Sequence, residues 1–467
     1  MKKIRQFLSI ALLVPAVLSC GKKNDPAETD GGKEPPKELT ISQESFNAEV
    51  DGGTIRLTVS APSRPKAAAS EGWIHVTDGV FKNYSIIYTV SIDANQSYSD
   101  RAGAVSVTSG SLSKTLSISQ PGMEAPVINE VNITKTLVTQ DPTPKVQALY
   151  DYLLTIYGKK TISSIMADVN WNTKEADKVF GAVGKHPAMN CYDFIHIYVP
   201  KNNWIDYTDL TPVTSWYNAG GIVSLMWHFN VPVNKDTQPG TDGSGVTCTP
   251  GKTTFRAANA LKDGTWENAW YIQETDKVAD IILRLQELGI PAIWRPYHEA
   301  AGNAYAKAWS GSAWFWWGFD GEEVYKQLWE DMFRRFNAKG IRNLIWVWTA
   351  QNFNGDSNSY DNDADYYPGD DFVDIIARDI YGDTPENNAV EFVQLQNQYN
   401  TKMITLGECG HNTSAGVQFP EIPDIWAAGA NWSWFMPWYG SSMPDTVWWK
   451  AALDNANVIT RESLPKL

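Results

Sequence analysis

At 467 residues the chain is too long for one ordinary small domain, and its length predicts two or three domains. A hydrophobic fraction of 43% and a charged fraction of 20% describe a globular protein rather than a disordered one. The formal charge of −14 at pH 7 argues against nucleic acid or an anionic membrane surface as the partner, because both repel an acidic protein.

Residues 1–19 have the pattern of an export signal. Three of the first five residues are basic, residues 7–18 form an apolar stretch too short to span a bilayer, and a small residue precedes Cys20. The run VLSC at this point resembles the lipobox of bacterial lipoproteins, which implies that Cys20 carries a lipid after residues 1–19 are removed. An ordinary secretory signal cut nearby is the alternative. Both alternatives predict export, and the lipobox predicts an outer-membrane lipoprotein of the cell envelope, held to the membrane by its lipid alone.

The segment after Cys20 predicts a tether, since residues 20–38 are polar and rich in Pro and Gly. The other cysteines, Cys191, Cys248 and Cys409, are odd in number and have no paired spacing. They indicate neither a disulfide framework nor a zinc site.

Residues 39–122 predict a small all-β sandwich. Short alternating runs separated by turn residues are typical of this class, and here they are TISQESFNAEV (40–50), GGTIRLTVSA (52–61), SIIYTVSI (85–92), AGAVSVTSG (102–110) and LSKTLSISQPG (112–122). The region holds one tryptophan and no cluster of His, Asp and Glu, so nothing in it predicts catalysis.

Scattered positions of this segment resemble the BACON domain of secreted Bacteroidetes enzymes. They are Phe46, Asp51 to Gly53, Trp73, Arg101 and Gln120 to Gly122. The resemblance implies a spacer or a weak glycan contact, and we favour the spacer. Residues 123–141 are the predicted linker to the next domain.

Residues 142–467 alternate between strand-like and helix-like runs. Eight apolar runs predict strands at 161–167, 188–194, 221–229, 292–299, 343–349, 373–381, 402–408 and 430–438. Amphipathic stretches such as 173–183, 270–289 and 322–340 lie between them, and the last two end in a helix-capping glycine. Eight such repeats predict an α/β domain of the (β/α)8 TIM barrel class. A doubly wound open sheet is the alternative, but its Gly-rich nucleotide loop is absent after the first run, where the chain reads DVNWN.

The tryptophans are concentrated in this second region, because only Trp73 of the 21 precedes Trp171. Some of them must fill the core of the barrel. However, aromatic faces also stack on sugar rings through dispersion and C–H contacts. An acidic, tryptophan-rich barrel is therefore a candidate for binding a neutral carbohydrate.

Polar side chains stand at the C-terminal ends of several predicted strands, where barrels of this class place their active sites. They are His228 after the third strand, His298 and Glu299 after the fourth, Asp379 and Tyr381 at the sixth, Glu408 at the seventh and Trp438 at the eighth. Glycoside hydrolysis needs one carboxyl group to protonate the leaving oxygen and a second to attack the anomeric carbon or activate water. Glu299 and Glu408 can fill these roles, with Tyr381 orienting Glu408 and Trp438 beneath the reacting sugar.

Each of these residues also has a structural alternative. A glutamate at a strand end is commonly a cap or an ion-pair partner, and His228 and His298 can be hydrogen-bonded core residues. Arg295 can neutralise a buried acid, and we expect Asp193, after the second strand, to be structural. Trp314 in the run WFWWG can be a packing residue. Together these alternatives require many polar residues to meet at one end of the barrel by chance.

The region from residue 142 to the end resembles glycoside hydrolase family 26, the β-mannanase family of clan A. The resemblance rests on RPYHE (295–299), on WFWWG from Trp314 and on LGE (406–408). It implies that Glu299 is the acid/base and Glu408 the nucleophile of a retaining mechanism.

The same resemblance implies roles for the neighbouring residues. His298 stands where most of the clan has Asn, and Asp379 and Tyr381 match an Asp-x-Tyr motif whose Tyr contacts the nucleophile. His228 and Trp438 match positions that bind the reacting sugar. Trp314 matches a stacking position on the leaving-group side.

The function that the resemblance implies is an endo-acting, retaining β-mannanase that cuts internal β-1,4-mannosidic bonds of mannan, galactomannan or glucomannan. A mixed-linkage β-glucanase or a β-1,3-xylanase on the same scaffold is an alternative, and so is a non-catalytic glycan-binding lipoprotein. The chemistry requires no metal and no cofactor, although the Asp-rich stretch 357–371 could hold a structural calcium ion. We expect a monomer whose partner is the polysaccharide.

Overall fold

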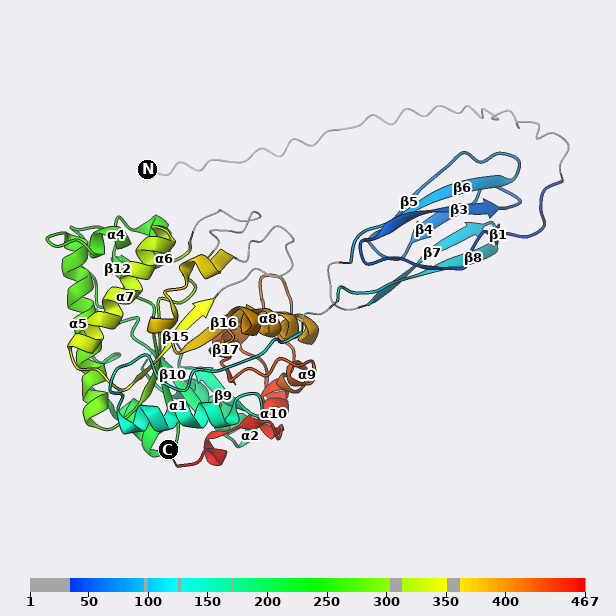
Figure 1. Cartoon of the computed structure of the whole chain (residues 1–467). Helices are drawn as coiled ribbons and strands as arrows, with labels where there is room; N and C mark the ends of the chain where they lie inside the picture. The colour runs from blue at the N-terminus through cyan, green and yellow to red at the C-terminus, as the bar shows by residue number, and fades with distance from the viewer. Residues whose placement is uncertain are drawn as a thin grey trace. The chain divides into compact units, whose positions relative to one another are not determined.

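The computed structural model describes residues 34–95, 100–124, 127–168, 171–302, 313–350 and 362–466, with the backbone alone at 362 and 363. Within these ranges the chain forms two compact units that divide between Pro121 and Gly122. The first unit is built of strands, and the second is a curled parallel sheet surrounded by helices (Figure 1). Cys20 and the predicted signal lie outside the described residues, as does part of the stretch 357–371.

The first unit is a sandwich of two four-stranded sheets, as the alternating pattern predicts. One sheet has the order β1 (Thr40–Ile41), β3 (Gly53–Ser60), β6 (Ser85–Ile92), β5 (Ile74–Thr77), and the other β2 (Ser45–Asn47), β8 (Leu112–Gln120), β7 (Arg101–Ser109), β4 (Lys66–Ala69). Leu57, Tyr88 and Leu116 are among the inward residues that form its core.

Two strands of the sandwich are not predicted by the sequence pattern. β4 reads KAAA, and alanine has a low strand propensity. β5 reads IHVT, which is too short to establish an alternation. The single predicted run 40–50 also divides into β1 and β2, which belong to different sheets.

The second unit is a parallel barrel, and its eight strands overlap the eight predicted runs one for one. They are β9 (Thr161–Met166), β10 (Met189–Asp193), β11 (Ile222–Trp227), β14 (Ala292–Pro296), β15 (Leu344–Ala350), β16 (Ile375–Tyr381), β17 (Met403–Gly410) and β18 (Trp434–Phe435). The barrel closes between β17 and β18, where Cys409 N donates to Met436 O at 2.9 Å and Trp438 N donates to Cys409 O at 2.8 Å. β19 (Val458–Ile459) adds a further parallel partner to β9.

Helices cover the outside of the barrel. The longer ones are α1 (Pro144–Ile156), α2 (Lys174–Val183), α3 (Thr211–Asn218), α5 (Trp266–Glu287), α7 (Glu322–Ala338), α8 (Pro385–Gln398), α9 (Ile422–Ala427) and α10 (Thr446–Asp454). Shorter elements are α4 (Ala257–Ala260), α6 (Trp316–Phe319), the pair β12 (Val231–Pro232) and β13 (Val246–Thr247), and the 3-10 turns η1 (Pro250–Lys252), η2 (Asn362–Tyr366), η3 (Asp370–Phe372), η4 (Gly440–Ser442) and η5 (Arg461–Ser463).

The ends of the long helices follow from their capping residues. Thr265 accepts a hydrogen bond from Asn268 N at the start of α5. Gly289 and Gly340, with φ of 69° and 85°, take the left-handed conformation after α5 and α7. In the part of the chain that the structure describes, no helix combines the length and the apolar character needed to cross a bilayer.

Both faces of the barrel strands are buried, which explains why their sequences are continuously apolar. Ile293, Ile345 and Ile375 lie in the interior of the barrel, whereas their neighbours Trp294 and Ile376 contact the helices outside. The interior cluster also contains Val146, Leu149 and Leu153 of α1, so this helix closes the N-terminal end of the barrel. Apolar side chains thus fill this end, and polar interior positions follow toward the other end.

Residues 127–141, which we call the strap, are bound to the barrel by hydrogen bonds. Thr134 N donates to Thr401 O at 2.8 Å, and Thr139 Oγ1 donates to Leu344 O at 3.3 Å. Val138 N donates to Oδ1 of the buried Asp374 at 2.8 Å. Most of the predicted linker 123–141 therefore has fixed contacts with the second unit.

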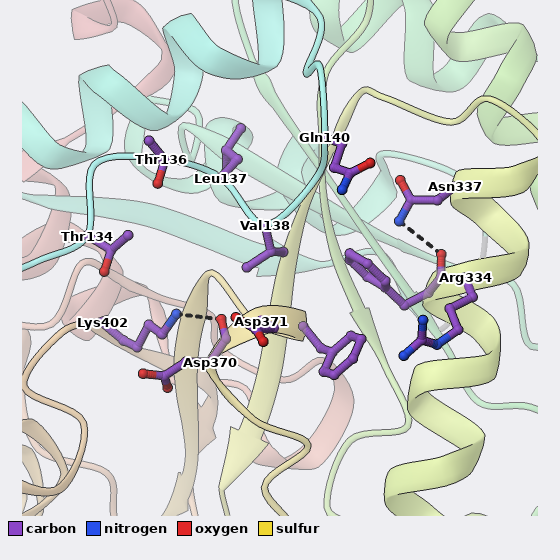
Figure 2. A pocket seen from close by; sticks show the side chains of 12 residues that line it. Thr134, Thr136, Leu137, Val138, Gln140, Arg334, Asn337, Asp370, Asp371 and Lys402 are labelled. Carbon is purple, nitrogen blue, oxygen red and sulfur yellow. Dashed lines mark hydrogen bonds between the residues drawn. The ribbon is translucent and has the colours of Figure 1, made fainter.

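A hollow of about 730 Å³ lies between the strap, α7 and η3 (Figure 2). Thr134 and Thr136 line one side of it, and Asp370 and Lys402 the other. The buried Lys402 Nζ donates to the carbonyl oxygens of Asp370 and Val373, at 3.0 and 2.8 Å. Because Lys402 directly precedes β17, this hollow lies at the N-terminal end of the barrel, opposite the polar strand ends.

Candidate active site

The interior faces of the strands bring the predicted polar residues to the C-terminal end of the barrel. Each strand alternates, so Arg295 follows the interior residue Ile293 of β14, and Asp379 follows the interior residue Ala377 of β16. Tyr381 is the next interior position of β16. The site is therefore built on rigid strands.

Glu408 reaches the interior through an irregularity of β17. Leu406 pairs with Arg378, but the register then shifts, and Glu408 pairs with Asp379. Gly407 is the extra residue of this bulge, and a bulge turns the following side chain to the other face. Without it Glu408 would point outward, as Leu406 does.

Two donors hold the Glu408 carboxylate. Tyr381 Oη donates to Glu408 Oε2 at 2.7 Å. Arg295 Nη2 donates to Glu408 Oε1 in a buried ion pair. Because the two donors bind different oxygens, they fix the orientation of the carboxylate.

Arg295 also binds the other carboxylate on the interior face. Its Nη1 lies 3.1 Å from Asp379 Oδ2 and 3.2 Å from Thr349 Oγ1. The negative charges of Asp379 and Glu408 raise the pKa of the Arg295 guanidinium, although burial opposes them. The guanidinium therefore stays charged and balances the two acids.

Glu299 differs from Glu408 in having the environment of a protonated acid. Burial, followed by the charges of Asp379 and Glu408, raises the pKa of Glu299 well above its usual range. A hydrogen bond to Asp379 raises it further, so the protonated Glu299 carboxyl donates and the Asp379 carboxylate accepts. Burial and Glu408 also raise the pKa of Asp379, to about 7.

The backbone around Glu299 is in a sparsely populated conformation. Tyr297 and Glu299 have φ of 48° and 52°, in the left-handed region that favours glycine. Such residues persist where the surrounding structure over-determines them, and they cluster at functional sites. Here Tyr325 Oη binds Tyr297 O at 3.0 Å and Trp317 Nε1 binds His298 O at 2.9 Å.

The three carboxyl groups of the site lie close together: one oxygen each of Glu299, Asp379 and Glu408 lies within 4.8 Å of the others. Among the described residues, this is the group whose spacing could hold a metal ion. Arg295 already binds Asp379 and Glu408 in ion pairs, so a cation would have to compete with it. The donor set thus fits proton transfer and nucleophilic attack better than it fits a metal ion.

Two histidines complete the polar wall. The Asp193 carboxylate binds His228 at two points: His228 N donates to Asp193 Oδ1 at 3.0 Å, and His228 Nδ1 lies 2.5 Å from Asp193 Oδ2. This contact leaves Nε2 of His228 directed elsewhere. His298 Nε2 lies 3.9 Å from Glu408 Oε1, and burial together with His228 and Arg295 lowers the pKa of His298 well below its usual value. His298 is therefore a neutral imidazole.

The aromatic residues have different positions. Trp438 packs near His228, with ring centroids 5.8 Å apart, so it belongs to the site. Trp314 is half-buried, and its ring centroid lies 6.5 Å from that of Phe315. It stands close in sequence to residues 303–312, which lie outside the described ranges. Its stacking role stays a prediction.

Two residues of the site are missing from the residues predicted to be functional. Arg295 binds both Asp379 and Glu408, and Asp193 orients His228. The position of Arg295 on the interior face of its strand, in line with the acids, was the available signal. Asp193 is the last residue of β10, and the other site residues also stand at strand ends. This position was the signal available in the sequence for its role.

The model of glycosyl hydrolase family 26 matches residues 138–463. Among curated proteins, the mannan endo-1,4-beta-mannosidase of Thermothelomyces thermophilus is 32% identical over 332 residues, which cover 68% of this chain and 60% of that protein. Mannan endo-1,4-beta-mannosidase B of a Piromyces species is 31% identical over 66% of this chain. The chain spans 48% of the length of that second relative.

Solved structures show the same barrel. The GH26 domain of an endo-beta-mannanase/endo-beta-glucanase from Prevotella bryantii has a TM-score of 0.69 and 53% identity, covering 71% of this chain and 99% of that one. A beta-mannanase from a symbiotic protist of the termite Reticulitermes speratus, complexed with a gluco-manno-oligosaccharide, has a TM-score of 0.58 and 32% identity. That match covers 73% of this chain and 100% of the other.

Proposed function

The chain belongs to glycosyl hydrolase family 26, and we propose from this membership that it is an endo-acting, retaining β-mannanase. Its substrate is a β-1,4-mannan, galactomannan or glucomannan. The observation that carries the proposal is the pair of unlike carboxyl groups. Burial and the neighbouring charges raise the pKa of Glu299, whereas Arg295 and Tyr381 bind Glu408. Glu299, Glu408 and Asp379 each place one oxygen within 4.8 Å of the others.

In the first step Glu408 attacks the anomeric carbon of the reacting mannosyl unit. A carbon–oxygen bond to Glu408 forms while the glycosidic bond breaks, and its electron pair goes to the leaving oxygen. Glu299 gives its proton to that oxygen, for which its raised pKa suits it. The product is a mannosyl ester of Glu408 and a shortened chain with a free hydroxyl.

In the second step Glu299, now a carboxylate, takes a proton from water. The hydroxide that forms attacks the anomeric carbon, and the bond to Glu408 breaks with its electron pair returning to the carboxylate. Two inversions give net retention. The short distance between the carboxyl groups favours the retaining mechanism. In inverting enzymes the two carboxyl groups are about 6.5–9.5 Å apart, which leaves room for a water molecule.

The choice of mannan follows the relatives, which carry the name mannan endo-1,4-beta-mannosidase. A mixed-linkage β-glucanase or a β-1,3-xylanase is the second candidate, which follows from the family resemblance. The Prevotella bryantii protein is described as an endo-beta-mannanase/endo-beta-glucanase, but that description covers a GH26-GH5A protein and not its GH26 domain alone. A non-catalytic glycan-binding protein is disfavoured by the intact carboxyl pair.

A polysaccharide panel tests the proposal. The full-length protein is incubated with glucomannan, galactomannan, linear mannan, mixed-linkage β-glucan and β-1,3-xylan, and new reducing ends are measured. We expect release from the mannans, with a rapid fall in viscosity because internal bonds are cut. Release from β-glucan or xylan alone would identify the second candidate, and no release from any polymer would leave only glycan binding.

The proposal extends to location and to the first unit. The lipobox supports attachment through Cys20 to the outer membrane, and the BACON-like sandwich fits a spacer that holds the barrel away from the surface. Metabolic labelling with a palmitate analogue should mark the wild-type protein and leave Cys20→Ala unmarked. Equal labelling of both would refute lipidation at Cys20.

A further inference from the structure

One tryptophan at the C-terminal end of the barrel is open to solvent. Trp204 is 47% exposed, and no other tryptophan of the described residues is as exposed. A large apolar ring that is half exposed to water gains only part of the free energy that its full burial would give. The exposed part of the ring is therefore available for stacking on a ligand.

The loop that carries Trp204 starts inside the candidate active site. Residues 194–210 follow β10 directly, and Asp193 at their start holds His228. Asn230 Nδ2 donates to Ile195 O at 3.1 Å, which ties this loop to the one after β11. The loop is thus a wall of the polar end of the barrel.

Local hydrogen bonds fix the turn that presents the ring. Asn202 Oδ1 accepts from Trp204 N at 2.9 Å and from Ile205 N at 3.2 Å, and Asn202 N donates to Ile205 O at 3.0 Å. Tyr207 Oη then donates to Asp193 O at 2.8 Å and returns the loop to the strand. Trp204 is consequently held in place before any ligand arrives, which lowers the entropy lost on binding.

A chain of contacts connects Trp204 to the site. Its ring meets the His196 ring at 4.9 Å in a perpendicular arrangement, which covers at most one face of the indole. Burial lowers the pKa of His196, and the charge of the nearby Asp193 opposes this effect. Asp193 in turn binds His228. The indole is therefore linked to the candidate active site through His196 and Asp193.

We propose that Trp204 is the stacking platform of a distal subsite, which binds a hexosyl unit of the polysaccharide several units away from the bond that is cut. The inference rests on the proposed function and extends the candidate active site along the loop after β10. A neutral sugar suits this place better than a charged ligand, because its ring stacks on indole while its hydroxyls can meet a neutral polar side chain such as the exposed Asn203.

The experiment compares a long and a short substrate on the full-length protein. The specificity ratio is kcat/KM for β-1,4-mannohexaose divided by kcat/KM for dinitrophenyl β-mannobioside, which is too short to reach a distal subsite. Trp204→Ala should lower this ratio at least fivefold, chiefly through KM, and Trp204→Phe should restore part of it. An unchanged ratio in a folded Trp204→Ala variant would overturn the inference.

Phe180→Ala is the matched control. Phe180 is 44% exposed and stacks on a histidine, His186, at 4.0 Å, but it lies on α2. Its ratio should equal that of the wild type, and a fall as large as that of Trp204→Ala would also overturn the inference. The two proposals fail differently: a wild-type protein inactive on both substrates contradicts the β-mannanase, whereas an active wild type with an unchanged Trp204→Ala ratio contradicts the subsite alone.

Discussion

Arg295 supplies the positive charge at a cluster of three carboxyl groups. It binds Asp379 and Glu408 but leaves Glu299 to share a proton with Asp379. A buried guanidinium with two ion pairs is strongly held, since removing either partner strands a charge in a medium of low polarity. The different surroundings of Glu299 and Glu408 thus come from which of them Arg295 touches.

This division of the carboxylates predicts different losses for two variants. Glu408→Ala should abolish turnover of mannan and of dinitrophenyl mannosides, because no group attacks the anomeric carbon. Glu299→Ala should lose polysaccharide hydrolysis yet still release dinitrophenolate in a burst, because that leaving group needs no proton. Stopped-flow absorbance and reducing-end release measure both.

Azide provides the stereochemical control for the Glu299→Ala variant. It needs no deprotonation, so it should relieve the stall and give the β-mannosyl azide, the product of two inversions. An α-mannosyl azide would indicate a single displacement and an inverting enzyme. Failure of folded Glu299→Ala to release dinitrophenolate would remove Glu299 from the acid role.

The raised pKa of Glu299 predicts a pH effect of Asp379→Asn. After burial, the negative charge of Asp379 is the largest cause that keeps the proton on Glu299. Without that charge Glu299 ionises more easily, so the acid form is lost at a lower pH as the pH rises. The alkaline limb of kcat/KM should therefore move to lower pH.

Asp370→Asn controls for a general charge effect, because Asp370 is exposed at the other end of the barrel. Its pH profile should coincide with that of the wild type. An alkaline limb of Asp379→Asn that stays in place or rises would show that another group limits the reaction at high pH.

At the scale of residues the sequence predicts the acids better than their partners. Glu299, Asp379 and Glu408 stand at strand ends, and the barrel class alone brings such positions together. The contacts of Arg295 and Asp193 depend on which side chains the neighbouring strands place beside them, and alternation within one strand does not contain that information. The conformation of Glu299 at positive φ is likewise invisible in the sequence.

At the scale of elements, the bulge in β17 decides whether the barrel has a nucleophile. An added Cβ at Gly407 would lie 2.7 Å from Asp379 Oδ1 and 2.9 Å from Ala377 Cβ, closer than real contacts allow. Gly407→Ala should therefore displace Asp379 or Glu408 and lower kcat/KM about 100-fold or more, a loss of roughly 3 kcal/mol of transition-state stabilisation. Kinetics with an activated aryl mannoside measure it.

Gly181→Ala is the control for a glycine change as such. Gly181 lies in α2 with nothing within 4 Å of an added Cβ. Activity should be unchanged, and the free energy of unfolding should rise by about 0.5–1 kcal/mol because alanine favours the helix. Full activity of Gly407→Ala would mean that the bulge tolerates a side chain and does not position Glu408 as described.

The elements themselves differ in how far the sequence predicts them. The barrel strands can be predicted from the sequence because both of their faces are buried. Each is therefore a continuous apolar run, and helices lie between the runs. β4 and β5 are short strands at the margins of the sandwich, and β18 has only two residues although its apolar run has nine. In these cases pairing partners, rather than local composition, set the strand limits.

At the scale of the whole molecule, the strap predicts where the chain can be shortened. A protein starting at Glu124 keeps the strap and should retain its melting temperature and its activity on soluble mannan. One starting at Pro142 loses the bonds of Thr134, Val138 and Thr139, and leaves the Asp374 carboxylate with one donor fewer. Its free energy of unfolding should fall by about 2–4 kcal/mol.

Calorimetry and reducing-end assays on the two shortened proteins check this. Equal melting temperatures would show that the strap contributes no stability. A loss of activity above about tenfold on removing the sandwich alone would correspond to over 1.4 kcal/mol of transition-state stabilisation and would contradict its role as a spacer.

The closure of the barrel has a consequence for biosynthesis. β9 is the first barrel strand to be made, yet its partners β18 and β19 are the last, and Ser163 Oγ donates to Ile459 O across 296 positions. A chain leaving the ribosome or an export channel therefore carries β9 with an open edge until β18 and β19 have emerged, and contacts this distant in sequence form slowly. The free edge of β9 is then open to pairing with another chain, so a factor that binds the unfinished sheet would protect it until β18 and β19 have formed.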